Sequence, residues 1–170
     1  MNRRNLPLLL LVFLHVITPA LHAQAKIGVY GTVGTENTGL TGEGWSKAGT
    51  LGLYYGLANL GPAAVSVDAR ADLSSNANTY AFGPRVALHA PAFPLKPYGE
   101  LLIGAIHYTT QSGGSKTSSD FAYRWVVGLD ETILPHVDWR ILDFSYGGGL
   151  SEPGKSVHIK TLTTGLVLRF

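Results

Sequence analysis

The chain alternates hydrophobic and polar positions over most of its length after residue 25. The clearest stretch is 63–73, where every second residue is apolar and the residues between them include two aspartates, an arginine and a serine. Successive side chains of a β-strand point to opposite faces, so one face of this stretch is apolar and the other is charged. The pattern predicts a strand that separates a hydrophobic environment from a polar one.

Seven further stretches of about ten residues, the length that a tilted strand needs to cross a membrane, are assigned the same period of two, although 97–108 is apolar on both faces and is oriented by turning Glu100 inward. They are residues 26–34, 49–57, 80–90, 97–108, 121–130, 137–146 and 162–170. Glycines occur inside most of these stretches, and each glycine in a helix interior costs about 1 kcal/mol relative to alanine. The pattern therefore predicts eight strands rather than helices.

One of these stretches carries a conflict. In residues 137–146 the alternation turns Trp139 and Ile141 outward, and the same register also turns Asp143 outward. A charge deep on a lipid-facing surface costs roughly 2 to 4 kcal/mol. We therefore expect a β-bulge near Leu142, or a position of Asp143 near the membrane interface.

The segments between the strands alternate in expected length. Short connections are expected at 59–62, 91–94 and 134–136, and long polar ones at 35–46, 74–79, 109–120 and 147–156. This alternation is typical of barrels in bacterial outer membranes. We predict an all-β fold, an eight-stranded antiparallel up-and-down transmembrane β-barrel with short periplasmic turns and longer extracellular loops. A soluble β-sandwich or lipocalin-like barrel is the alternative, because alternation alone does not say which face meets water.

The first residues have the layout of a cleavable export signal. Arg3 and Arg4 precede an apolar stretch at 6–17, which is shorter than the roughly 20 residues of a membrane-spanning helix, and small residues follow. We expect a signal peptide over residues 1–25, cleaved after Ala23 or Ala25, and a barrel domain over residues 26–170.

Composition narrows the possible partners. The chain has 13 basic and 11 acidic residues, so removal of Arg3 and Arg4 leaves 11 of each and no basic surplus for nucleic acid. It has no cysteine, which excludes disulfides, a thiol nucleophile and a lipoprotein acylation site.

Several loose motifs together resemble a known family. They are Lys96-Pro97-Tyr98-Gly99-Glu100, Gly128-Leu129-Asp130 before Pro135, Trp139-Arg140 with Tyr146, and residues 165–170. The chain resembles the small eight-stranded outer-membrane barrels, which include the opacity proteins and the membrane domain of OmpA-type porins. The resemblance implies a porin-like protein in the outer membrane of a Gram-negative-type bacterium. Its outer face would contact the membrane lipid, and the barrel-assembly machinery would insert it. That machinery reads a terminal aromatic strand, here marked by Leu162, Leu166, Leu168 and Phe170. We expect a monomer.

Charged residues gather on the face that a membrane barrel turns inward. They form a near-balanced set: Asp68, Arg70, Asp72, Arg85, Glu100, Arg124, Asp130, Asp138 and Arg140. The interior of an eight-stranded barrel is just wide enough for side chains to fill it, and a buried charge without a partner is costly. We predict a structural network of ion pairs across the lumen, with a narrow small-solute channel as the alternative.

Chemical motifs are weak. Residues 149–156 match the phosphate-loop pattern, but a strand rather than a helix follows them, so a glycine-rich surface loop is the better interpretation. The histidines have no metal-ligand spacing. Ser156, His158 and Glu152 are the nearest candidates for a lipid A-modifying enzyme, but Ser-x-His reverses the expected order. We expect no catalytic residue, no metal and no cofactor.

The predicted function is that of a non-enzymatic integral outer-membrane protein with a structural or surface-interaction role, exerted through its extracellular loops. A lipid A-modifying enzyme and a narrow channel remain the alternatives.

Overall fold

The structure, a computed structural model, describes residues 26–39, 44–75, 77–89, 94–110, 116–149 and 157–170. These residues form eight strands. Their bounds are β1 Ile27–Asn37, β2 Ser46–Leu60, β3 Ala63–Ser74, β4 Ala77–Leu88, β5 Leu95–Thr110, β6 Lys116–Leu134, β7 Val137–Gly149 and β8 Val157–Arg169. The eight predicted strands are therefore present, and several are longer than expected. The predicted signal peptide lies outside the described residues.

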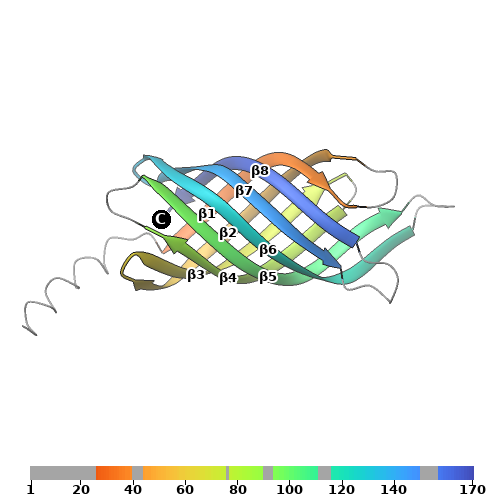
Figure 1. The fold of residues 1–170 in the computed structure, drawn as a ribbon, viewed down its shortest axis with the longest axis horizontal. Helices are drawn as coiled ribbons and strands as arrows, with labels where there is room; N and C mark the ends of the chain where they lie inside the picture. Colours follow the sequence, from red (N-terminus) through yellow and green to blue (C-terminus); the bar gives the residue numbers. More distant parts are fainter. Residues whose placement is uncertain (1–25, 40–43, 76, 90–93, 111–115, 150–156) are drawn as a thin grey trace, which may run out of the picture.

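The strands close into a barrel in sequence order (Figure 1). Every neighbouring pair is antiparallel, and β1 pairs with both β2 and β8. The closing seam continues beyond the strands, because Ile27 and Phe170 exchange two backbone hydrogen bonds of 3.2 and 2.8 Å. A closed barrel leaves no unpaired sheet edge, which is the condition for strands to cross a membrane. The predicted fold class is confirmed.

The two faces of the barrel match the predicted polarity. Along β4, buried and exposed residues alternate without exception, and the exposed ones include Tyr80, Phe82, Val86 and Leu88. Charged side chains occupy the buried face instead. This arrangement is the reverse of a water-soluble barrel, so the sandwich and lipocalin-like alternatives were wrong. Among the described residues, no helix is long and apolar enough to span a membrane.

Asp143 lies inside the barrel. The pairing of β7 with β8 shifts register between Arg140 and Asp143, as a β-bulge does. Trp139 and Leu142 are both exposed on the outer face, whereas Asp143 is only 1% exposed. The extra residue thus returns the carboxylate to the lumen, which confirms the bulge predicted near Leu142.

The connections define two different ends of the barrel. At the end that carries Ile27 and Phe170, here called the termini end, the connections are residues 61–62, 89–94 and 135–136. The left-handed backbone that two-residue turns need is supplied by Gly61 and His136, with φ of 64° and 68°. The opposite end, here called the loop end, carries connections 38–45, 75–76, 111–115 and 150–156.

The long loop predicted at 74–79 was wrong. Strand β3 ends at Ser74 and β4 begins at Ala77. The Ser74 hydroxyl closes this tight connection, since it accepts a hydrogen bond of 3.0 Å from the Ala77 amide and is 2.9 Å from the Ala77 carbonyl. The polar residues that suggested a loop instead belong to the turn and to the first part of β4. The other three loop-end connections are longer than this one, but shorter than predicted because the strands extend into them.

Candidate functional site

The nine charged residues predicted to face the lumen all lie inside the barrel. None of them is more than 4% exposed. From the termini end to the loop end they fall into three groups, which we call the mouth cluster, the central cluster and the loop-end cluster. Each group also contains residues that the sequence did not single out.

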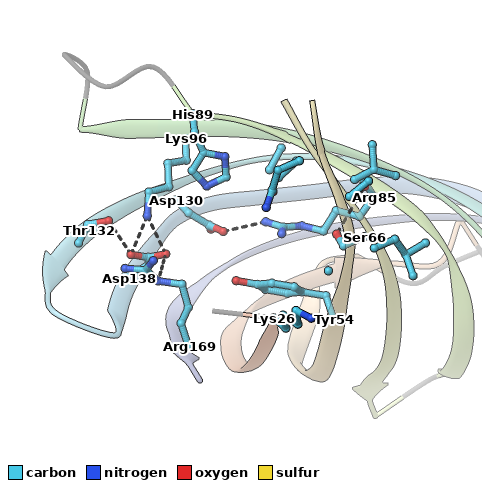
Figure 2. A pocket seen from close by; sticks show the side chains of 17 residues that line it. Lys26, Tyr54, Ser66, Arg85, His89, Lys96, Asp130, Thr132, Asp138 and Arg169 are labelled. Carbon is cyan, nitrogen blue, oxygen red and sulfur yellow. Dashed lines mark hydrogen bonds and ion pairs between the residues drawn. The ribbon is translucent and has the colours of Figure 1, made fainter. Parts of the chain in front are cut away.

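The mouth cluster surrounds Asp138 on β7 (Figure 2). Its carboxylate accepts hydrogen bonds of 3.1 Å from Lys96 and of 2.7 Å from Thr132. The Arg169 Nε lies 2.9 Å from the same carboxylate. Lys96 and Arg169 approach Asp138 from opposite sides, and their side chains retain 15% and 24% exposure. One carboxylate is therefore shared by two cations that water still reaches.

The central cluster begins at Arg70 on β3, whose side chain is fully buried. Its two terminal nitrogens donate to both oxygens of Asp143, at 3.1 and 2.8 Å, which is the bidentate geometry of strong guanidinium–carboxylate pairs. Glu100 lies 3.2 Å from the same guanidinium and Asp68 lies 3.7 Å from it. Arg70 thus neutralises carboxylates from three other positions of the wall.

Two further arginines complete the central cluster. Arg85 on β4 lies 3.0 Å from Asp130 and 3.2 Å from Glu100. Arg140 on β7 lies 2.9 Å from Asp130 and 3.4 Å from Asp143. A buried ion pair is tolerated only when its geometry is good and its remaining hydrogen-bonding capacity is largely satisfied. Glu100, Asp130 and Asp143 are each shared between two arginines, which balances their charges, whereas both oxygens of Glu100 are left without a hydrogen bond.

Tyrosine rings separate the guanidinium groups of this cluster. Arg85 lies 4.3 Å from the Tyr54 ring centre and 4.2 Å from that of Tyr98. Arg140 follows at 4.6 Å from Tyr98 and 4.1 Å from Tyr30. Aromatic and cationic groups therefore alternate in one stack, and each contact adds about 0.5 to 2 kcal/mol of cation–π attraction. The stack packs like charges close together without direct contact.

Each of these tyrosines faces a glycine on the adjacent strand. Tyr98 pairs with Gly128 across β5 and β6, and a Cβ added at Gly128 would collide with its ring. Tyr30 and Tyr54 meet Gly52 and Gly28 in the same way. Glycine is needed at these positions because it has no side chain, so the large tyrosine ring can lie flat against the barrel wall. The glycines of the alternating stretches are thus packing positions for the stack.

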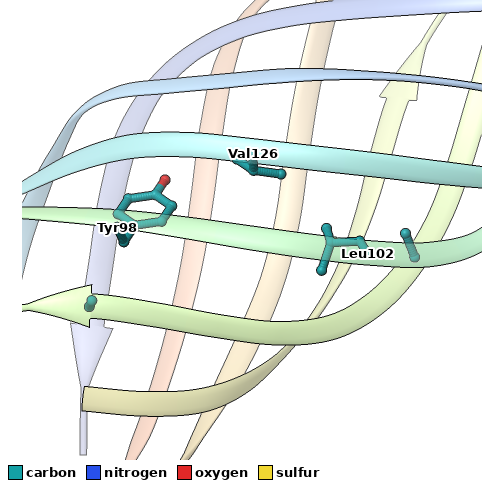
Figure 3. Close-up of a cluster of buried hydrophobic side chains, with 5 residues drawn as sticks. Tyr98, Leu102 and Val126 are labelled. Carbon is teal, nitrogen blue, oxygen red and sulfur yellow. The ribbon is translucent and has the colours of Figure 1, made fainter. Parts of the chain in front are cut away.

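A layer of apolar side chains lies beyond the stack toward the loop end. Leu102 and Val126 fill the lumen between β5 and β6, at 2% and 1% exposure (Figure 3). Their neighbours in the cluster are Ala81, Ala87 and Tyr98. This apolar patch lies on the β5–β6 side of the lumen, where Val126 pairs with Glu100 of the central cluster and Leu102 pairs with Arg124 of the next group of charges.

The loop-end cluster is organised by Arg124 on β6. Its guanidinium contacts Asp72, lies 3.5 Å from Glu36 and donates a hydrogen bond of 3.2 Å to the Ser145 hydroxyl. Thr50 also donates to Asp72, at 2.6 Å. Beyond this group, a second apolar cluster of Ala77, Ile106, Ala122 and Ile159 lines the lumen.

Some of these residues could not be recognised from the sequence pattern, for identifiable reasons. Glu36 was placed in a loop, but β1 continues to Asn37 and carries it inside. Asp143 could be placed in the lumen only by assuming the β-bulge near Leu142. The three tyrosines of the stack could have been found, because each lies on the polar face of its alternating stretch. Lys96 and Arg169 lie near strand ends, where the pattern alone does not distinguish lumen from solvent.

The residues weighed for chemistry are only partly described. Ser156 and Glu152 lie outside the described residues, as does most of the phosphate-loop match at 149–156. His158 is exposed and its ring stacks on Tyr146 at a centroid distance of 6.1 Å. In the part of the chain that the structure describes, no group of three His, Cys, Asp or Glu side chains is arranged to hold a metal.

The terminal strand presents its apolar residues to the outside. Leu162, Leu166, Leu168 and Phe170 are 43%, 51%, 46% and 67% exposed. With Thr164 they form an outward row along β8 that ends at Phe170, just after the strand. Their role as an assembly signal stays a prediction.

Comparison with known proteins identifies the fold. No protein-family model matches the chain, and no curated protein matches it. Neisserial surface protein A is 15% identical, with a TM-score of 0.57 over 85% of this chain and 96% of its own. The N-terminal β-barrel domain of Pseudomonas aeruginosa OprF is 10% identical, with a TM-score of 0.63 over 86% and 99%. The outer membrane enzyme PagL is 14% identical, with a TM-score of 0.57 over 84% and 99%.

The chain has the fold of the small eight-stranded outer-membrane barrels, as the resemblance predicted. The exposed apolar face and this shared fold support the expected outer-membrane location. A surface protein, a membrane domain and an enzyme all share the architecture, so the fold by itself does not assign an activity.

Proposed function

We propose that this protein is a non-enzymatic integral outer-membrane protein that exerts a structural or surface-interaction role through its loop-end connections, with the barrel as a rigid anchor. The observation that carries the proposal is the filled lumen. Arg70 on β3 binds Asp143 on β7, Arg85 and Arg140 share Asp130, and the tyrosine stack packs between the arginines. The lumen is thus occupied by structure, which leaves the two ends and the lipid-facing wall for function.

The filled lumen also argues against the channel alternative. Conduction requires a continuous hydrated path, whereas buried ion pairs, tyrosine rings and the apolar patch of Leu102 and Val126 occupy this lumen. The full chain reconstituted in planar bilayers should show no conductance above that of empty lipid. Reproducible single-channel steps would refute the anchor interpretation and favour the channel.

Surface interaction is favoured over a purely structural role by the difference between the two ends. Three of the loop-end connections have five to eight residues, whereas two of the termini-end turns have two. Neisserial surface protein A, which shares the fold, is by its name a surface protein. Connections on a rigid scaffold are the usual place for recognition.

A loop exchange tests this role directly. Residues 40–43, 111–115 and 150–155 would be replaced by glycine–serine segments of equal length in cells that display the protein. The exchanged variant should keep its heat-modifiable gel migration, which reports a folded barrel, but lose attachment to immobilised matrix proteins and glycans. Equal attachment by both forms would contradict the surface-interaction role. A matched exchange at the termini end, of residues 90–93, serves as the control.

One contact favours a second candidate, an acyl hydrolase at the membrane surface. His107 Nδ1 and the Ser119 hydroxyl are 2.7 Å apart on paired positions of β5 and β6, near the loop end. A serine beside a histidine base is the start of a nucleophilic site. The adjacent carboxylate, Asp120, instead accepts a hydrogen bond of 2.7 Å from Tyr108. Among the described residues, no carboxylate contacts His107 to orient it, so we place this candidate second.

The two candidates predict different lipid profiles. Mass spectrometry of lipid A from cells with and without the protein should show the same acylation pattern if the barrel is non-enzymatic. Loss of an acyl chain that depends on Ser119, tested with Ser119→Ala, would establish the hydrolase. The control is Ser118→Ala on the same strand.

A further inference from the structure

The termini end of the barrel opens into a cavity of about 450 Å³ around the mouth cluster (Figure 2). Its walls come from β2 to β8 and include Tyr54, Ser66, His89 and Thr132 beside the charged residues. Cavities of this volume lie within the range that holds small molecules or their head groups. In the proposed membrane orientation the cavity faces the periplasm.

Positive charge predominates in this cavity. It is lined by four cations and two carboxylates, which gives a formal charge of +2: Lys26, Arg85, Lys96 and Arg169 against Asp130 and Asp138. Arg85 and Asp130, which pair with each other, belong both to this cavity and to the central cluster, and their charges cancel. The remaining residues of the central cluster have the opposite balance, with two arginines facing three carboxylates. The cationic surplus is therefore a property of the mouth and not of the lumen as a whole.

Several nitrogens in the cavity wall are buried without a hydrogen-bond partner. They are the Nε atoms of Arg85 and Arg169 and the Nδ1 atom of His89. The two Nε atoms lie within ion-pair distance of Glu100 and Asp138, at 3.2 and 2.9 Å, but make no hydrogen bond to them. An anion that enters the cavity would share these donors with the carboxylates.

We propose that the mouth cluster binds a phosphate group, carried by a soluble phosphomonoester or by a phospholipid headgroup of the inner leaflet. A phosphate dianion matches the formal surplus of two positive charges. Its several oxygens also match a site in which arginine and lysine approach from different strands. The inference rests on the membrane orientation given under the proposed function.

Asp138 pairs with the cations of the site when no anion is bound. In the structure it holds Lys96 and Arg169 in place. Both cations keep partial exposure, so each can turn toward an anion that enters from the open side. Arg85 is held more firmly by Asp130 and forms the floor. The cations are thus oriented before the phosphate arrives, which lowers the entropic cost of binding.

The test uses the full chain in a maltoside detergent, which carries no phosphate, with inorganic phosphate and glycerol 3-phosphate as probes. NMR of the arginine Nε–H and histidine side chains should show saturable shifts at Arg85, Arg169 and His89. A second arm compares nanodiscs of phosphatidylethanolamine and phosphatidylglycerol with nanodiscs of phosphate-free digalactosyldiacylglycerol. Saturation by soluble probes identifies a soluble phosphomonoester as a ligand, and shifts confined to the phospholipid nanodiscs identify the headgroup.

The variant Lys96→Gln/Asp138→Asn/Arg169→Gln removes one net positive charge and should weaken binding at least tenfold. Lys47→Gln removes the same net charge at the other end of the barrel, where Lys47 is exposed, and should leave binding unchanged. Arg169→Met alone, with binding weakened several-fold, is the second variant if the triple variant does not show heat-modifiable migration. Unchanged binding in the folded mouth variants, or no saturable shift in either arm, would overturn the proposal. Either result would leave the loop-exchange test of the proposed function unaffected.

Discussion

The central cluster and the mouth cluster use the same kinds of residue in different surroundings. At the centre, the side chains of Arg70 and Arg140 are fully buried and contact tyrosine rings. At the mouth, Lys96 and Arg169 reach one carboxylate and remain partly exposed. Water weakens the interaction of charges that it reaches, so the mouth pairs can exchange partners whereas the central pairs cannot. Identical chemistry therefore stabilises the barrel in one place and offers a binding site in the other.

Removal of one arginine from each cluster should have very different effects on stability. Arg140→Met should lower the free energy of unfolding by about 3 to 5 kcal/mol, because Asp130 and Asp143 lose a buried partner. Arg169→Met should cost less than about 1 kcal/mol, since its pair is partly solvated. Urea unfolding in micelles, followed by tryptophan fluorescence, measures both. Similar losses for the two variants would mean that burial does not separate the clusters.

A smaller change tests the hydrogen bonding of the central cluster without removing a charge. Tyr98→Phe keeps the ring beside Arg85 and Arg140 but removes the hydroxyl that donates to Asp143 at 2.6 Å. A hydrogen bond to a charged group contributes about 1.5 to 3 kcal/mol, and we expect a loss of this size. Tyr55→Phe, on the exposed outer face, should be close to neutral in the same unfolding assay. A neutral Tyr98→Phe would show that stacking alone positions the cluster.

The room beneath the tyrosine stack can be tested at Gly128. Gly128→Ala places a methyl group against the Tyr98 ring and should cost about 1 to 3 kcal/mol through overpacking. Gly99→Ala on the neighbouring strand is the matched control, because its added methyl group would meet only the Val126 carbonyl oxygen at 3.8 Å. Equal stability of the two alanine variants would contradict the packing role of Gly128.

The smallest expected effect is at the mouth and concerns titration. Burial lowers the pKa of His89, which follows β4 at the termini end, and the nearby cations Lys96 and Arg85 lower it further. The folded protein thus binds this proton less readily than the unfolded chain does. Any contribution to stability is therefore lost as the pH falls below the ordinary value of 6.5.

NMR titration of the imidazole should give a midpoint below that value. Lys96→Gln should raise the His89 pKa, and Lys47→Gln at the other end of the barrel should not. A midpoint at or above the ordinary value would indicate that the mouth is more hydrated, or more negative, than the structure shows.

The sequence predicted most of the barrel, for a physical reason. Alternation reports which environment each face of a strand meets, and a membrane barrel imposes that contrast on every strand. The local amino-acid composition predicted the ends of the strands less well. The polar residues at 74–79 suggested a loop because serine, asparagine and threonine favour turns, but in a barrel with a polar lumen the same residues can occupy a strand.

The alternation in the sequence was enough to group most of the lumen-facing side chains on one face of their strands, but not Glu36, Lys96 or Arg169, and Asp143 only with a bulge assumed. Which of these side chains meet was set by the tertiary structure. Arg70 and Asp143 are 73 positions apart, and their bidentate pair depends on the closure of β1 onto β8 and on the register shift after Arg140. A shift of one residue turns a side chain to the other face, so partners across the lumen are set by register and curvature. Register and curvature are not visible in a local sequence pattern. Together they produce the difference between the fully buried central cluster and the open mouth cluster.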